Sequence, residues 1–313
     1  MNEMNPNNQQ QMPIYDDEID LRELFGVLWK GKLTIIAVGV LATVIAVGVA
    51  LSMPNIYRSE AVLAPATKSS SSNLMSKYGG LASLAGISLP KGEADKTVIA
   101  MEVLQSRSFF KQFNERHPDV MPALMAVENW DSSTNQLVFD DDLYIAESKK
   151  WVREAVPPRK SKPPVQDAHE VFAKLLTVSQ DKDSGLVSIA VQHRSPYVAQ
   201  QWVEWLVDDI NQVIRDQDVE QAEKSIAYLK EQISETAVAD LQAGFFEMIQ
   251  DQIQTIMLAK ATPEYLFKTI DPAVVPELKV KPKRALIVVL GAVLGGMLGV
   301  MWVLIRRYAM NKE

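Results

Sequence analysis

The chain of 313 residues contains no cysteine and only three histidines. Without cysteine there is no C-x-x-C pair for zinc or redox chemistry. The histidines, His117, His169 and His193, are scattered along the sequence, and there is no H-E-x-x-H pair. An oxidising compartment tolerates a cysteine-free chain, but the absence of cysteine does not establish one. We therefore predict no metal site and no cofactor.

Catalytic motifs are lacking as well. There is no G-x-x-x-x-G-K-[ST] phosphate loop and no G-x-S-x-G nucleophile elbow. The consecutive aspartates Asp140, Asp141 and Asp142 do not have the alternating ligand spacing of a calcium loop, and they predict a solvated acidic turn. The net charge of -7 argues against nucleic acid as the main partner. These absences indicate a protein that is not an enzyme.

Two long runs without charged residues are present, at 33–53 and 285–305. About 20 apolar residues in a helix are enough to cross the hydrocarbon core of a bilayer. We predict a transmembrane helix in each run. A cleaved signal peptide is the alternative for the first run, but the polar tail of residues 1–32 precedes it, whereas a signal peptide begins close to its apolar core.

The second run carries glycines at intervals of four residues, at Gly291, Gly295 and Gly299. In the first run, Ala42 and Ala46 repeat this interval. Small residues at this spacing let two helix backbones approach closely, because packing has to replace the hydrophobic effect inside lipid. The alternative is that glycine is simply common in membrane helices. We favour a helix-packing face.

Two spans place both ends of the chain on the same side of the membrane. Basic residues flank both ends of the second run: Arg306 and Arg307 follow it, and Lys279, Lys281, Lys283 and Arg284 precede it. The charge count is therefore close to a tie. Long loops cross the membrane largely regardless of charge, and the first helix usually sets the orientation. With Lys30 and Lys32 before the first run, we predict cytoplasmic tails at 1–32 and 306–313, both too short for a folded enzyme or signalling domain.

The region 54–195 is predicted to be an α/β base. A strand spans Ile56 to Pro65, and the segment 74–90 has the small, apolar composition of a surface that packs against a neighbour. Helical spacing follows from 98 to 113, with a break near Ser106, and a short hairpin is predicted within 135–146. A helix ending at Leu175 and two strands joined by the turn "DKDSG" complete the unit.

The region 196–262 has the longest helical pattern. Ser195 and Pro196 provide an N-cap and a first-turn proline, and apolar residues recur at threes and fours, as in a coiled coil, with no proline before Pro263. Such a length has to project or fold back, and we predict a bend between 234 and 244. Trp202 and Trp205 are predicted to be core residues, with sugar stacking as the alternative.

A return strand and a proline-rich segment with Pro272, Pro276 and Pro282 follow at 263–284. The predicted fold class is an α+β membrane protein, in which two transmembrane helices flank an α/β base domain with a long protruding helical arm.

Three segments resemble a known family: "PNIYRSEAVLAP" after the first span, "GGLASLAGISL" after the first strand, and "FKTIDPAVVPELKVKPKR" running into the glycine-repeat span. Together with the long charged helix they resemble the Wzz-type chain-length determinants, the class 1 polysaccharide co-polymerases, over nearly the whole chain. Class 2 relatives add or partner a tyrosine kinase with a phosphate loop. The absence of that loop and of a C-terminal tyrosine cluster favours class 1.

The resemblance implies a double-pass protein of the bacterial inner membrane with cytoplasmic termini and a periplasmic base and arm. It implies a homo-oligomer that works with a Wzy-type polymerase to set the modal length of O-antigen or a related lipid-linked polysaccharide. Gly291, Gly295 and Gly299 with Ala42 and Ala46 would then serve membrane-helix packing or contact with the polymerase. The basic residues before the second span would lie at the periplasmic membrane surface. The alternatives are a membrane-anchored periplasmic sensor or adaptor, a component of capsule or exopolysaccharide export, and a glycan-processing enzyme.

Overall fold

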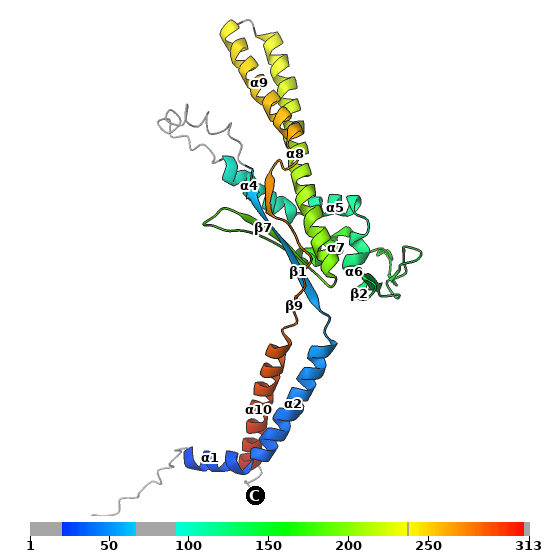
Figure 1. Cartoon of the computed structure of the whole chain (residues 1–313), viewed down its shortest axis with the longest axis vertical. Helices are drawn as coiled ribbons and strands as arrows, with labels where there is room; N and C mark the ends of the chain where they lie inside the picture. Colours follow the sequence, from blue (N-terminus) through cyan, green and yellow to red (C-terminus); the bar gives the residue numbers. More distant parts are fainter. Residues whose placement is uncertain (1–20, 67–91, 237, 310–313) are drawn as a thin grey trace, which may run out of the picture. The chain divides into compact units, whose positions relative to one another are not determined.

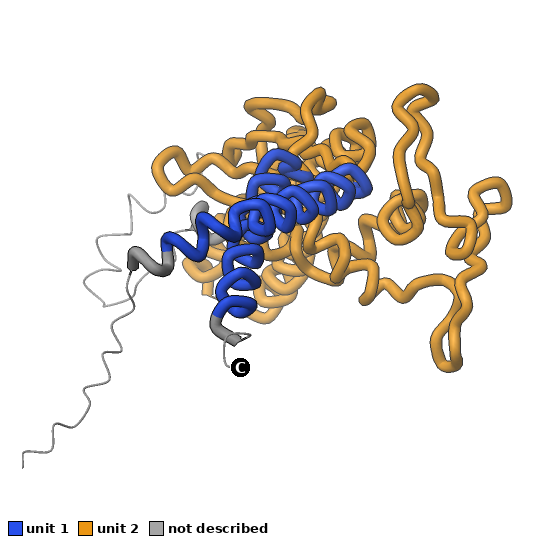
Figure 2. Tube along the Cα trace, turned by 90° about the horizontal axis from the view of Figure 1, so that it is seen from below, with its two compact units in different colours: residues 1–53, 282–313 blue, residues 54–281 orange. Residues whose placement is uncertain are grey.

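The computed structural model describes residues 21–66, 92–236 and 238–309 of the chain (Figure 1). The polar residues 1–20 and the small, apolar segment 74–90 lie outside the described residues. The chain divides into two compact units, one formed by residues 1–53 and 282–313 and the other by residues 54–281 (Figure 2).

The first unit contains three helices: α1 (Leu21–Lys30), α2 (Lys32–Ser52) and α10 (Arg284–Ala309). Helices α2 and α10 pack along each other, and α1 lies crosswise at the end where α2 begins (Figure 1). By length and composition, α2 and α10 are both able to cross a membrane.

The second unit is built on an antiparallel sheet. Its strands are β1 (Ile56–Pro65), β6 (Leu176–Gln180), β7 (Val187–His193), β8 (Phe267–Asp271) and β9 (Lys279–Lys281). The order is β6-β7-β1-β8, and β9 also pairs with β1. Alternate residues of β1, namely Ser59, Ala61 and Leu63, are buried, as expected for a strand with one face in the core. The predicted first strand is confirmed.

Helices pack against this sheet and form the core of the base. They are α4 (Gly92–Leu104), α5 (Arg107–Arg116), α6 (Val120–Met125), α7 (Val165–Leu175) and the first half of α8 (Pro196–Glu235). The core centres on aromatic side chains that are at most 2 % exposed: Phe109, Phe110, Phe113, Phe172 and Trp202. The prediction that Trp202 is a core residue is therefore confirmed. The break between α4 and α5 also lies where the sequence predicted it, because Ser106 caps α5 by accepting a hydrogen bond from the Phe109 amide.

The predicted single hairpin within 135–146 is wrong. Two small hairpins occupy this region: β2 (Val127–Asp131) pairs with β3 (Gln136–Phe139), and β4 (Tyr144–Ile145) pairs with β5 (Lys150–Trp151). The Asp131 carboxylate accepts hydrogen bonds from Ser133 and Thr134, and Asn135 adopts a positive φ of 55°. The turn therefore forms before β3, and it pairs that strand with the preceding segment.

The hairpin of β6 and β7 agrees with the sequence. Asp181 Oδ1 accepts hydrogen bonds from the amides of Asp183, at 3.0 Å, and Ser184, at 2.7 Å. Gly185 then takes a φ of 73°, a left-handed conformation that favours glycine.

The arm is a helical hairpin. Helix α8 ends at Glu235, and α9 (Ala239–Ala261) runs back beside it (Figure 1). The turn lies inside the interval predicted for the bend. The side-chain amide of Gln242 donates to the Thr236 carbonyl, at 2.7 Å, and to that of Ile233, at 3.3 Å, so it caps the end of α8. Residues of α8 up to Ile214 are buried with the base core, and the arm projects beyond them.

Strand β8 is fastened to α8 by one side chain. Asn211 Oδ1 accepts hydrogen bonds from the amides of Leu266, at 2.8 Å, and Phe267, at 2.9 Å. Asn211 Nδ2 donates to the carbonyls of Phe267 and Val207, both at 3.1 Å. The side chain is 3 % exposed, so losing it would leave buried backbone groups without partners.

We predict that Asn211→Ala destabilises the protein by about 2 to 3 kcal/mol, because buried polar groups would be orphaned. Denaturant unfolding of the purified full chain measures the change. Gln212→Ala is the matched control, because Gln212 is the exposed neighbour on the same helix. Equal stability of the two variants would contradict the role assigned to Asn211.

His193 is a buried and uncharged histidine. Its Nδ1 accepts a hydrogen bond from the Ser195 amide, at 3.0 Å, which leaves Nε2 protonated to donate to the Ala123 carbonyl, also at 3.0 Å. Burial lowers the pKa of His193 below its usual value of 6.5. The folded state therefore binds fewer protons than the unfolded state at mildly acidic pH.

We predict that stability falls as the pH drops through the window below about 6.5, by up to about 1.4 kcal/mol per pH unit from this one residue. Unfolding at pH 7.5 and at pH 5.5 measures the slope. His193→Gln removes the titration, so its stability should depend less on pH than that of the wild type. An unchanged slope in His193→Gln would refute the prediction.

Candidate functional site

The glycine face of α10 lies against α2. A Cβ atom added to Gly291 would come within 2.4 Å of Ala46 Cβ, and one added to Gly295 would come within 2.4 Å of Ala42 Cβ. A Cβ atom at Gly299 would lie 2.9 Å from Ile35 Cα. These distances are too short for real side-chain atoms, so the packing of the two helices depends on glycine at all three positions.

Two residues of this seam were not singled out in the sequence. Ile35 contributes backbone atoms opposite Gly299, and the Cα of Gly39 would lie 3.1 Å from a Cβ atom at Gly295. Gly39 precedes Ala42 and Ala46 by three and seven residues, which places it on the same helix face. This spacing is the sequence pattern from which the role of Gly39 could have been predicted. For Ile35 no signal existed, because its backbone and not its side chain makes the contact.

The other faces of the helix pair are exposed and apolar. Large side chains on these faces are 52–62 % exposed, among them Leu41, Val44, Ile45, Leu290, Leu294 and Leu298. Inside a bilayer such faces contact lipid tails or other transmembrane helices. The small-residue face is thus occupied within the chain, and the large-residue faces are open to partners.

The prolines of the approach segment lie beside the sheet. Pro272 and Pro276 are in the stretch between β8 and β9. This stretch is anchored through carbonyl groups, because Ser59 Oγ donates to the Val274 carbonyl at 2.7 Å and Gln200 Nε2 donates to that of Ala273 at 3.4 Å. Proline has no amide hydrogen to offer a neighbouring strand, so anchoring by carbonyls suits this stretch.

The end of the approach segment lies in the unit of the membrane helices. Pro282 begins this part of that unit, and its carbonyl accepts a hydrogen bond from the Arg284 amide at 2.9 Å.

The predicted basic patch is divided between the two units. Lys279 and Lys281 are exposed residues of β9, in the unit that contains the sheet, and Lys279 Nζ donates to Asn55 Oδ1 at 3.0 Å. Lys283 and Arg284 belong to the unit of the membrane helices. The structure thus assigns these residues to two different bodies.

Charged groups inside the second unit connect its helices. Asp209 pairs with Arg116 at 2.9 Å, and His117 stacks on Trp205 with ring centroids 4.0 Å apart. These contacts place Trp205 in the packing between α5 and α8.

A second polar contact lies nearer the arm. Asp218 accepts a hydrogen bond from the Tyr265 hydroxyl at 2.6 Å and pairs with Lys96 at 2.9 Å, and burial together with Asp218 raises the pKa of Tyr265. Within the described ranges, no group of three or more His, Asp or Glu side chains is arranged to hold a metal ion. These contacts fix the position of the arm on the base.

Comparison with known proteins gives two family matches. Residues 17–116 match the family described as chain length determinant protein, Wzz. Residues 243–308 match the family described as "G-rich domain on putative tyrosine kinase". No curated protein sequence matches the chain.

Two solved structures are similar to this chain at low sequence identity. A full-length bacterial polysaccharide co-polymerase is 16 % identical, with a TM-score of 0.41, over 94 % of this chain and 99 % of the other. A fragment of WzzB, a polysaccharide co-polymerase from Salmonella Typhimurium, is 14 % identical, with a TM-score of 0.26, over 72 % of this chain and 100 % of the other.

Two adjacent glycines of α10 allow the packing of α2 against α10 to be tested with a matched pair of variants. Gly295→Ala adds a methyl group 2.4 Å from Ala42 Cβ, whereas a Cβ atom at Gly296 meets nothing within 4 Å. We predict that Gly295→Ala weakens the packing of the two helices and that Gly296→Ala does not, because only the first methyl group separates the backbones. Thermal unfolding of the purified chain in detergent measures the difference. Equal melting curves would contradict the geometry of the seam.

Proposed function

We propose that this chain is a Wzz-type chain length determinant and that it sets the modal length of O-antigen or a related lipid-linked polysaccharide as a non-catalytic co-polymerase. The observation that carries this proposal is the family match over residues 17–116, which spans α1, α2, β1, α4 and α5. The two helices able to cross a membrane support it, because a lipid-linked glycan is elongated at a membrane surface.

In this proposal the protein acts as a homo-oligomer, in which several copies surround one axis with their arms side by side. Apolar side chains of the arm support this arrangement, because they are 46–65 % exposed in a single copy: Tyr228, Leu241, Phe246, Met248, Ile253 and Met257. Exposed apolar residues in such numbers are typical of a surface that a partner covers.

The proposed polymerase contact lies on the large-residue faces of the helix pair. The glycine face already packs against α2. A Wzy-type polymerase would therefore meet side chains such as Leu294 and Leu298. A ring of such contacts would change how long a growing glycan stays engaged, and so shift the balance between extension and release.

The proposed location is the bacterial inner membrane, with both termini cytoplasmic and the base and arm periplasmic. Lys30 and Lys32 near the start of α2 and Arg306 and Arg307 near the end of α10 support this orientation, since basic residues favour the cytoplasmic side. Lys279 and Lys281 would then attract the phosphate groups of lipids or of a pyrophosphate-linked glycan at the outer surface.

A second candidate function is a role in capsule or exopolysaccharide export. The match of residues 243–308 to a domain found on tyrosine kinases favours it, because kinase-linked relatives are of the class 2 type. The two candidates differ in their effect on total polymer. A length determinant changes the distribution of lengths, whereas an export component is required for the polymer to reach the surface.

We predict that cells without this chain lose the preferred length band of their surface polysaccharide but still make polymer of scattered lengths. A gel of that polysaccharide, beside the parent and a complemented strain, measures this. Complementation with Gly296→Leu should restore the band, and Gly295→Leu should restore it poorly, because its side chain would overlap Ala42. Immunoblots have to show equal protein levels.

Two results would overturn the proposal. Complete loss of surface polymer would favour the export function. An unchanged ladder in the deletion strain would favour a sensor or adaptor. If Gly295→Leu fully restored the band, length control would remain the function, but the packing of α2 against α10 would not be required for it.

A further inference from the structure

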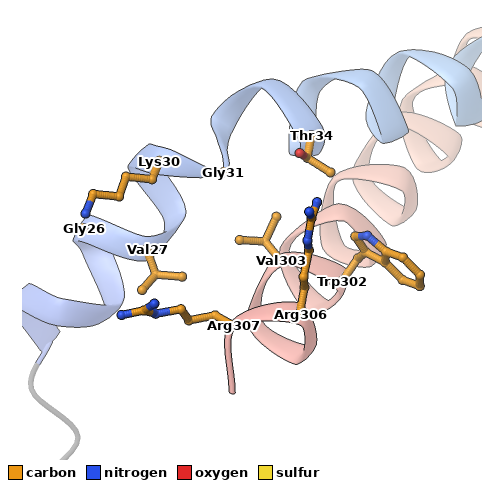
Figure 3. A pocket seen from close by; sticks show the side chains of 9 residues that line it. All are labelled: Gly26, Val27, Lys30, Gly31, Thr34, Trp302, Val303, Arg306 and Arg307. Carbon is orange, nitrogen blue, oxygen red and sulfur yellow. The ribbon is translucent and has the colours of Figure 1, made fainter. Parts of the chain in front are cut away.

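A cavity of about 550 Å³ lies in the membrane-helix unit, where α1, the start of α2 and the end of α10 meet (Figure 3). Its volume is within the range of small-molecule sites, which is about 300–1,000 Å³. Residues from both ends of the unit's sequence line it, including Lys30, Thr34 and Arg307. The cavity exists only because the chain brings these distant segments together.

A close backbone contact forms one wall of this cavity. A Cβ atom at Gly31 would lie 2.5 Å from Val303 Cγ1 and 2.8 Å from Cγ2, so only glycine allows this approach. Gly31 links α1 to α2, and the contact draws the junction of these helices against α10. Val303 is 9 % exposed as a result. This packing places the backbone from which Lys30, Arg306 and Arg307 extend.

The lining of the cavity is cationic. Lys30, Arg306 and Arg307 line it, and none of the described side chains that line it is acidic. In Figure 3 the guanidinium of Arg306 reaches toward Thr34 and that of Arg307 toward Val27. No salt bridge among the described side chains involves any of the three. Guanidinium groups bind phosphate oxygens well, and a cavity lined by two of them and a lysine favours an anionic ligand.

The aromatic residues nearby indicate the depth of this cavity in a bilayer. Phe25 and Trp29 of α1 stack with ring centroids 6.0 Å apart and are 66 % and 62 % exposed. Trp302 of α10, which lines the cavity, is 60 % exposed. Aromatic residues on a helix at the end of a membrane span lie at the level of the headgroups. The cations around the cavity are therefore at the depth of lipid phosphates.

We propose that this cavity binds the phosphate headgroup of an anionic phospholipid from the leaflet at this end of α2 and α10. Arg306, Arg307 and Lys30 hold the phosphate, and the acyl chains extend along the apolar surfaces of the two helices. The occupied site fastens α1 to α10 at the membrane surface. This inference does not depend on length control, because it concerns the lipid around the helices and not the glycan.

Native mass spectrometry of the full chain in detergent tests the proposal, with phosphatidylglycerol and phosphatidylcholine offered in equal amounts. We expect the protein to retain phosphatidylglycerol preferentially. The triple variant Lys30→Gln, Arg306→Gln, Arg307→Gln should retain at least about tenfold less phosphatidylglycerol than wild type. Each basic residue near the membrane surface contributes to the attraction of anionic lipid. The triple variant Lys160→Gln, Lys162→Gln, Lys182→Gln changes the net charge equally at exposed residues of the other unit and should behave as wild type.

Further experiments distinguish a lipid headgroup from free phosphate, and a loss of the site from misfolding. Inorganic phosphate that displaces phosphatidylglycerol at millimolar concentration would overturn the assignment to a lipid. The charge-preserving variant Lys30→Arg, Arg306→Lys, Arg307→Lys should retain most of the lipid binding. Equal retention of the two lipids by wild type, or undiminished retention by the Gln variant, would refute the proposal. The circular dichroism spectrum of the Gln variant should match that of wild type, so a loss of binding reports on the site.

Discussion

The pairing of β9 with β1 is the constraint on which the second unit depends. Asn55 and Lys279 are joined by a hydrogen bond of 3.0 Å although they are 224 residues apart in the sequence. This pairing places the start of β1, which follows α2 in sequence, beside the strand that precedes α10. The chain between these two strands, including the arm, therefore forms one long loop whose two ends meet in the same sheet. Closing such a long loop costs conformational entropy, and the burial of the aromatic core and the contacts of Asn211 offset it.

The membrane-helix unit meets a different constraint, because lipid removes the hydrophobic effect as a reason for helices to associate. Gly295 and Gly299 replace it with backbone contact against Gly39 and Ile35. Gly296, one residue along the helix, has nothing within 4 Å of its missing Cβ atom. The two adjacent glycines thus illustrate why composition alone is a poor guide to membrane-helix packing: the same residue type is essential on one face and indifferent on the other.

The sequence predicted what periodicity and length encode. The helices at 32–52 and 284–309, the strand beginning at Ile56 and the turn of the arm all lie where the residue pattern indicated. The hairpin at 135–146 failed because the turn is made by Asp131 side-chain hydrogen bonds, which carry no periodic signal. The contacts of Asn211 could not be predicted, since a polar residue in a long helix usually faces solvent. The Gly31 contact was equally hidden, because it joins segments more than 270 residues apart in the sequence.

The basic residues at the two ends of α10 resemble each other in sequence and differ in structure. Lys279 and Lys281 extend from a strand whose backbone is paired with β1, and Lys279 is hydrogen-bonded to Asn55. Arg306 and Arg307 instead line a cavity where α1, α2 and α10 meet. Counting charges beside a span weighs these residues equally, which is why the count gave nearly a tie. Cations that line one pocket are placed to bind a single ligand together, whereas a cation on an exposed strand acts through a diffuse field that salt screens within about 10 Å. The distribution of the charges around α10 therefore separates residues that line a pocket from residues on an exposed strand, and only the folded chain reveals this difference.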